Sequence, residues 1–73
     1  MRKIYQLMVG DRQINAVYPN EGLAVYHAEL MSEDREEIVR IWEAEETPGL
    51  YLEDLEWELI KVALNGVVYA KTP

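Results

Sequence analysis

Residues 60–70 have the sequence IKVALNGVVYA, in which an Asn-Gly dipeptide separates two runs of β-strand formers. Asn65 and Gly66 both tolerate the positive φ angles of a type I′ turn, and this dipeptide between hydrophobic runs is the strongest short-range signal for a β-hairpin. A two-residue turn would place two pairs opposite one another on one face, Leu64 with Val67 and Val62 with Tyr69.

The segment before this hairpin fits two interpretations. Leucines at positions 52, 55 and 59 have helical spacing, whereas residues 54–59 alternate between polar and apolar as a strand does. The hairpin favours the strand. Because the alternation changes phase before residues 60–64, we expect a β-bulge near Leu59 and Ile60.

Further upstream, the pattern predicts a helix that follows Ser32 and ends at residues 47–49. Ser32 is a favourable N-cap, and the acidic residues behind it would complement the helix dipole. Pro48 cannot extend the backbone hydrogen bonding of a helix. The buried stripe of this helix would consist of Ile38, Ile41 and Trp42.

The first thirty residues are predicted to form strands. Residues 3–9 are rich in strand formers and end at a Gly-Asp turn, and residues 14–18 alternate before a turn at residues 19–22. A third strand over residues 23–30 would follow. The alternative is a helix capped by Asn20, in which Leu23, Tyr26 or His27, and Leu30 share a face.

The expected fold is therefore a single α+β domain over residues 1–73, with element order β-β-β-α-β-β. One helix would pack on one face of a small antiparallel sheet. The chain has 73 residues, of which 49% are hydrophobic and 29% charged, so a folded domain is expected. A domain of this size buries only about 60% of the surface of its unfolded chain, and association would help to stabilise it.

The composition excludes several classes of protein. The chain contains no cysteine, so disulfides, thiolate nucleophiles and cysteine-based metal sites are ruled out, and a reducing, cytoplasmic location is expected. We see no signal-peptide pattern and no apolar run long enough to span a membrane. The net charge of −7 disfavours direct binding to nucleic acid or to anionic lipid.

The negative charge is concentrated in one part of the chain. Residues 29–58 contain twelve Asp and Glu residues against two Arg, a net charge of −10. One interpretation is an ordinary solvated face. The other is a docking surface for a basic partner, in which carboxylates imitate the phosphates of a nucleic acid. The expected partner-binding residues are Glu33, Glu36, Glu37, Glu43, Glu45, Glu46, Tyr51, Glu53, Asp54, Glu56, Trp57 and Glu58.

No catalytic motif is apparent, and we expect neither a cofactor nor a metal site. His27 is the only histidine and Ser32 the only serine, while the glycines are scattered singly and form no phosphate-binding loop. The leading hypothesis is a non-enzymatic inhibitor of a basic, nucleic-acid-handling protein. A short, acidic, cysteine-free chain is similar in format to anti-CRISPR and anti-restriction proteins of phages and mobile elements, which is an analogy of format only.

Two alternatives remain open at this point. The first is a structural or regulatory subunit that forms homo- or hetero-oligomers through an unprotected strand edge such as Val67–Ala70. The second is a small metal-binding protein or enzyme that uses His27 and carboxylates.

Overall fold

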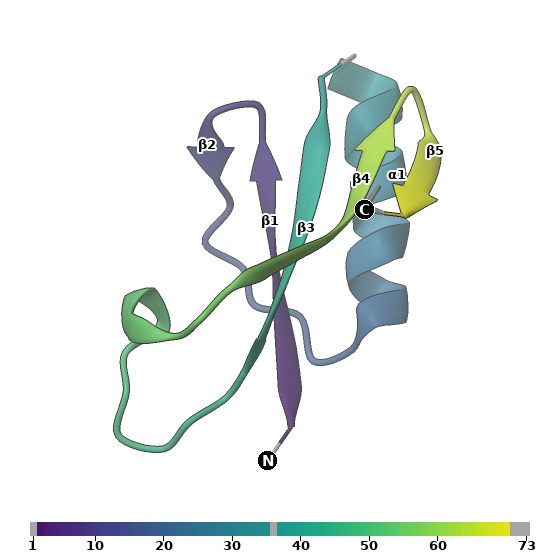
Figure 1. Ribbon diagram of the computed structural model, residues 1–73. Coiled ribbons are helices and arrows are strands. Elements are labelled where there is room, and N and C mark those ends of the chain that lie inside the picture. The colour runs from purple at the N-terminus through teal and green to yellow at the C-terminus, as the bar shows by residue number, and fades with distance from the viewer. Residues whose placement is uncertain (1, 36, 71–73) are drawn as a thin grey trace.

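The computed structural model describes residues 2–35 and 37–70 of the chain. Its strands form one five-stranded sheet in the order β2-β1-β3-β4-β5, and every neighbouring pair is antiparallel. The described part measures 37 × 24 × 20 Å. The elements in chain order are β1 (Lys3–Val9), β2 (Arg12–Gln13), α1 (Glu21–Arg35), β3 (Val39–Glu45), the short 3-10 helix η1 (Leu52–Asp54), β4 (Glu58–Leu64) and β5 (Val67–Ala70) (Figure 1).

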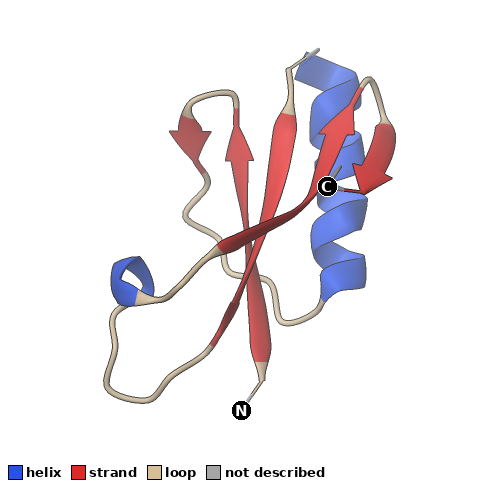
Figure 2. Ribbon diagram, in the orientation of Figure 1, coloured by secondary structure: helices blue, strands red, loops and turns tan. Residues whose placement is uncertain are grey.

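The expected fold class is confirmed, because one helix packs on one face of an antiparallel sheet (Figure 2). The expected order of elements is wrong. The chain runs β-β-α-β-β-β rather than β-β-β-α-β-β. A helix and a strand have exchanged places relative to the prediction, so the outline of the fold is the same while residues 21–46 have different roles.

The predicted strand over residues 23–30 is a helix, as the alternative had it. The side-chain oxygen of Asn20 accepts a hydrogen bond from the N–H of Leu23 at 2.8 Å, which is the N-cap interaction that begins α1. The helix turns its small residues, Ala24, Ala28 and Ser32, toward the sheet, and all three are fully buried. Small side chains let the helix backbone approach the sheet closely, and this requirement outweighs the strand propensity of the segment.

The helix predicted after Ser32 is wrong, since residues 39–45 form β3 in the middle of the sheet. Val39 and Ile41 are fully buried against α1, and β3 is hydrogen-bonded to β1 on one side and to β4 on the other. Two ladders supply more backbone hydrogen bonds and burial than an isolated amphipathic helix could, so tertiary pairing overrides the local pattern.

Ser32 is not an N-cap but a buried residue within α1. Its hydroxyl donates to the carbonyl of Glu29 at 3.0 Å and accepts the N–H of Gly66 at 3.0 Å. This pair of bonds connects the helix to the turn between β4 and β5. The predicted N-cap at Ser32 is therefore wrong, because its hydroxyl bonds to a residue far away in the sequence instead of capping a helix.

The second predicted strand is also shorter than expected. Arg12–Gln13 pair with β1 and the N–H of Ile14 still donates to the carbonyl of Leu7 at 2.9 Å, but residues 15–17 leave the sheet before a single bridge joins Tyr18 to Tyr5. Tyr18 is buried under α1, so the segment runs toward the helix instead of extending the ladder.

The C-terminal hairpin is confirmed in register. Leu64 pairs with Val67 and Val62 with Tyr69. Asn65 and Gly66 have φ angles of 52° and 79°, as a type I′ turn requires. The expected bulge is present as well, because Ile41 is opposite Lys61 and Trp42 is opposite Leu59, which leaves Ile60 as the extra residue.

The two faces of the sheet differ in cover. On the face against α1, Tyr5, Leu7 and Val9 join the main core. The other face, which we call the uncovered face, carries the strand side chains that point away from α1. None of the described strand residues whose side chains lie on this face is acidic. The residues of the uncovered face are Ile4, Gln6, Met8, Gln13, Arg40, Trp42, Ala44, Leu59, Val62, Leu64, Val67 and Tyr69.

Candidate partner-binding surface

A long connection between β3 and β4, residues 46–57, leaves the body of the sheet at one end of the molecule (Figure 1). It turns at Pro48-Gly49, where Gly49 has a φ of 88° and the N–H of Leu50 bonds to the carbonyl of Thr47 at 3.2 Å. The chain then forms η1, in which the N–H of Asp54 bonds to the carbonyl of Tyr51 at 2.9 Å. The connection therefore has defined local structure.

A small second core anchors this connection on the uncovered face. Leu55 packs with Ile4 and Ala44, and Trp57 lies against the cluster. The indole Nε1 of Trp57 donates to the carbonyl of Leu52 at 2.8 Å, which ties η1 to the start of β4. Trp57 is half-buried, and its role as a partner-binding residue stays a prediction.

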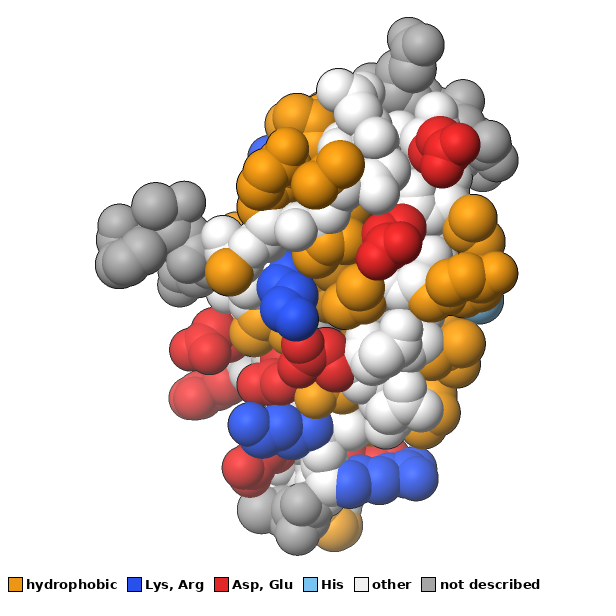
Figure 3. Space-filling model, turned by 90° about the vertical axis from the view of Figure 1, so that its right-hand side faces the viewer, with side chains coloured by type: hydrophobic (Ala, Val, Ile, Leu, Met, Phe, Trp, Pro, Cys, Tyr) orange, Lys and Arg blue, Asp and Glu red, His pale blue; other side chains and the backbone are white. Residues whose placement is uncertain are grey.

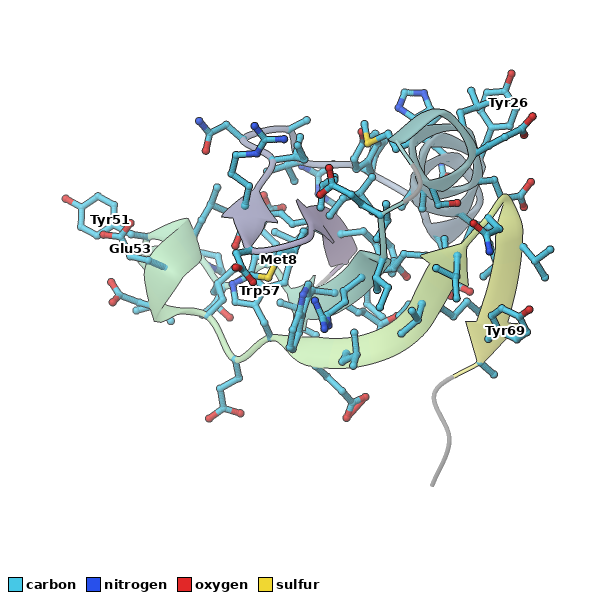
Figure 4. The ribbon with its side chains drawn as sticks, turned by 90° about the horizontal axis from the view of Figure 1, so that it is seen from above. Met8, Tyr26, Tyr51, Glu53, Trp57 and Tyr69 are labelled. Carbon is cyan, nitrogen blue, oxygen red and sulfur yellow. The ribbon has the colours of Figure 1, made fainter. Side chains whose placement is uncertain are left out.

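Three consecutive apolar side chains project from the connection. Leu50, Tyr51 and Leu52 are 51%, 75% and 42% exposed. Figure 4 shows Tyr51 at the outer limit of this end of the molecule, with Glu53 beside it. The sequence singled out Tyr51 but missed the two leucines, although the Pro-Gly turn before them indicated a loop. An exposed run of this kind is unusual in a segment with defined structure.

Carboxylates surround these apolar residues. A hollow of about 370 Å³ is lined by Glu45, Asp54 and Glu56 together with Thr47, Leu50 and Leu55. Glu46 and Glu53 are exposed in the same connection, and Glu58 is exposed at the start of β4. We call the following set the acidic surface: Glu45, Glu46, Leu50, Tyr51, Leu52, Glu53, Asp54, Glu56 and Glu58.

Little positive charge offsets the acidic surface. Within the described residues, its ion pairs are limited to one, in which Arg2 Nε contacts Glu46 at 2.7 Å. This hydrogen bond lowers the pKa of Glu46 below its usual range. Because both side chains are exposed, the pair is weak and leaves the surface strongly negative.

The structure separates two of the remaining predicted residues, Glu33 and Glu37, from this surface. Glu33 lies on α1 next to the Gly66 turn and Glu37 lies beside Gly10, at the opposite end of the sheet from residues 46–57 (Figure 1). Glu43 is half-buried and pairs with Lys3 at 3.3 Å. Glu36 lies outside the described residues. The predicted helix that would have carried the carboxylates from Glu33 to Glu46 does not form, because residues 39–45 are β3.

An apolar groove on the uncovered face adjoins the acidic surface. It has a volume of about 200 Å³ and is lined by Met8, Gln13, Trp42 and Trp57. Met8 and Trp57 lie side by side in Figure 4. The indole N–H of Trp42 is buried without a hydrogen-bond partner among the described residues. Trp42 therefore belongs to a surface groove rather than to the buried stripe of a helix.

A second, more polar hollow continues this groove toward η1. Gln13 and Trp57 line both, and the second hollow adds Glu53. Two side-chain amides of this hollow are hydrogen-bonded to each other, because Gln13 Nε2 donates to Gln6 Oε1 at 2.7 Å. The two together place indole rings, amide groups and one carboxylate along a single depression. The remaining lining residues of the second hollow are Gln6, Asn15 and Leu52.

The tyrosines and the histidine between α1 and the sheet form polar contacts of their own. His27 Nδ1 lies 3.0 Å from the hydroxyl of Tyr18, whose ring meets the imidazole edge-on. Burial raises the pKa of Tyr18. Burial also raises the pKa of Tyr5 to about 12, and the neighbouring carboxylates of Glu43 and Glu21 add to the increase. Both phenols therefore stay protonated and act as structural groups.

The described residues contain no cluster of three or more His, Asp or Glu side chains arranged to hold a metal ion. None of the helices in this part of the chain is long and apolar enough to cross a membrane.

No family model matches the chain, and none of the curated proteins or solved structures does either.

Proposed function

We propose that this protein is a non-enzymatic interaction protein whose acidic surface binds a basic protein. The observation that carries the proposal is the exposed run Leu50-Tyr51-Leu52 surrounded by carboxylates. Tyrosine is enriched among the residues that dominate binding energies at interfaces, and here it is 75% exposed in a segment held by its own hydrogen bonds. An ordered, exposed aromatic side chain loses little entropy on binding.

The charge of this surface selects the kind of partner. Six carboxylates belong to the acidic surface, and the described ion pairs offset only Glu46. Such a field speeds the encounter with a positively charged protein and repels an acidic one. Strongly basic surfaces occur in proteins that bind the phosphate groups of nucleic acids. The proposed partner is therefore a nucleic-acid-handling protein, which this chain would inhibit by occupying its phosphate-binding groove. A cytoplasmic location is part of this proposal.

The adjoining groove suits an arginine side chain of the partner. An indole face attracts a guanidinium group, and the apolar walls formed by Met8 and Trp57 would contact the aliphatic part of the side chain. Glu53 stands in the adjoining hollow, where its carboxylate can pair with the guanidinium. The groove thus adds specificity to a surface that charge alone would leave unselective.

The experiment is an affinity capture at low and high salt, followed by mass spectrometry. We expect a basic protein that is lost at high salt, since screening weakens contacts between exposed charges. Tyr51→Ala should reduce capture, and so should the double variant Glu53→Gln with Glu56→Gln. The matched control carries Glu33→Gln with Glu37→Gln, which changes the charge equally at the other end of the molecule and should capture as well as the wild type.

The inhibitor part of the proposal needs a second measurement. The captured partner, once purified, should release its bound DNA or RNA when this protein is added, and the Tyr51→Ala variant should release less. Capture that is insensitive to salt, or equal loss in both double variants, would contradict binding through the acidic surface. A captured partner that keeps its nucleic acid would contradict inhibition alone.

A further inference from the structure

The two edges of the sheet differ in how they are protected from other strands. The β2 edge is only two residues long and carries Arg12. The β5 edge has the sequence Val67-Val68-Tyr69-Ala70 and contains neither a charge nor a proline. Edge strands usually carry such devices because free backbone groups pair with any strand that approaches. The four residues of β5 have none of them, although Lys71 and Pro73 follow the strand in the sequence.

The register of the hairpin identifies which backbone groups are free. Residues that flank a two-residue turn form a hydrogen-bonded pair, so Val67 directs its N–H and C=O toward Leu64 on β4. Because these groups alternate along a strand, Tyr69 also faces β4, whereas Val68 and Ala70 face the open edge. Neither Val68 nor Ala70 has another backbone partner among the described contacts.

We propose that a second copy of this chain pairs with the open edge, β5 against β5, antiparallel about a two-fold axis with Val68 opposite Val68. In this register the outward N–H and C=O groups of the two Val68 residues bond to each other. Val67 of each copy lies opposite Tyr69 of the other, a cross-strand pair of an aromatic and a β-branched residue. Both side chains lie on the uncovered face and are about half exposed, at 50% and 54%.

The charge distribution favours a second copy in spite of the net charge of −7. The strand residues of the uncovered face include no carboxylate. Pairing of the two β5 edges therefore brings no acidic strand residues together on this face. The carboxylate of Glu33 lies beside the Gly66 turn, and it falls at the end of the shared ladder. The acidic surface lies at the far end of β4 and remains outside the contact (Figure 1).

The flank that carries β5 supports the same arrangement. In Figure 3, hydrophobic side chains gather over the β4–β5 hairpin and, separately, along the outer side of α1. The helix patch contains Leu23, Tyr26 and Leu30, but its backbone groups are already bonded within the helix. Of these two patches, the one over the hairpin combines exposed apolar side chains with free backbone groups.

The contact is small, so the dimer should form in a concentration-dependent way. Stable interfaces bury more than about 1,000 Å² in total, and a four-residue edge strand is at the low end of that range. The mass measured by sedimentation should therefore rise from 8.5 kDa toward twice that value as the concentration increases. The informative range is from about 10 µM to about 1 mM.

Two variants and one control test the location. Tyr69→Lys places a charge on the edge, and Ala70→Pro removes an outward N–H that β4 does not use. Both should remain monomeric at every concentration while they unfold at the wild-type temperature. Tyr26→Lys is the control, since it makes the same change at a site of nearly equal exposure, 56%, on α1. It should dimerise as the wild type does.

Amide hydrogen exchange tests the register. The amides of Val68 and Ala70 should exchange quickly in dilute protein and become at least tenfold slower at high concentration, whereas those of Val67 and Tyr69 should be protected at both. A wild type that stays monomeric at about 1 mM overturns the proposal. So does a dimer that persists in Tyr69→Lys and Ala70→Pro, or one that leaves the Val68 amide unprotected. These outcomes are independent of partner capture, which depends on the acidic surface.

Discussion

Ser32 Oγ accepts a hydrogen bond from the backbone N–H of Gly66 at 3.0 Å, which joins the buried side of α1 to the turn of the C-terminal hairpin. The two residues are 34 positions apart. Gly66 has a φ of 79°, and a Cβ there would lie 3.3 Å from a carboxylate oxygen of Glu33. The turn type, the choice of glycine and the buried serine therefore form one structural unit.

Replacing Ser32 by alanine should destabilise the protein by about 1–3 kcal/mol, because the N–H of Gly66 is left without its acceptor at a partly buried site. Chemical denaturation measures the loss. Thr47→Ala is the control, since the Thr47 hydroxyl also donates to a carbonyl, that of Glu45 at 3.3 Å, but is exposed. We expect that control to cost less than about 0.5 kcal/mol. Equal effects would show that the Ser32 contact contributes nothing beyond an ordinary surface bond.

Replacing Asn20 by alanine should cost about 1 kcal/mol, because it removes the N-cap of α1. The same measurement on Asn15→Ala provides the comparison. Asn15 is an exposed residue that caps no helix, so its replacement should leave the free energy of unfolding nearly unchanged. If Asn20→Ala is as stable as Asn15→Ala, the cap is not a determinant of the helix.

Stability should fall as the pH rises from about 10 to about 12. The ordinary pKa of tyrosine is 10.0, and burial raises that of Tyr5 to about 12, so the unfolded chain loses this proton first. Deprotonation then favours the unfolded state, and the contribution present below pH 10 is lost at up to roughly 1.4 kcal/mol per pH unit. Burial raises the pKa of Tyr18 as well, so it contributes in the same direction.

The variant Tyr5→Phe isolates this effect. Its stability should depend less on pH in that window, as followed by denaturation at each pH with tyrosinate absorbance recorded in parallel. Tyr51→Phe is the control, because it removes a phenol that is 75% exposed rather than buried. A Tyr5→Phe variant with the slope of the wild type would rule out Tyr5 as the source.

Replacing Trp57 by phenylalanine should loosen η1, because the bond from Nε1 to the carbonyl of Leu52 is lost. We expect a cost of about 1 kcal/mol in unfolding and weaker capture of the proposed partner. Trp42→Phe is the matched change, since the N–H of Trp42 has no partner among the described residues. Its replacement should affect stability less. The opposite ranking would mean that packing of the indole rings, rather than this bond, holds η1.

The hairpin and its bulge could be predicted because their causes are local. Asn65 and Gly66 specify the turn, and the change of phase at Ile60 is visible in the alternation itself. The exchange of helix and strand could not be predicted in the same way. Ala24 and Ala28 carry little hydrophobic signal, yet their small size lets α1 approach the sheet.

In the candidate site too, features with local causes could be predicted and those set by long-range pairing could not. Tyr51 was among the expected partner-binding residues and is 75% exposed beside acidic residues, while its role in binding stays a prediction. The grouping of Glu33 with Glu46 depended on a helix that does not form. Trp42 was assigned to a buried stripe, but its position on the uncovered face is set by pairing with Gln6 and Leu59, which are far from it in sequence.

The connection that carries Tyr51 has a further consequence, which concerns how this protein can evolve. Residues 46–57 contribute only Leu55 and Trp57 to the packing of the second core, and none to the main core. Changes in the length or sequence of this segment therefore leave the main core and its strand register intact. Under the proposed function, a lineage could therefore replace its partner by altering residues of this segment other than Leu55 and Trp57, which pack in the second core. A library randomised within this segment would be a direct route to new binding specificities on the same scaffold.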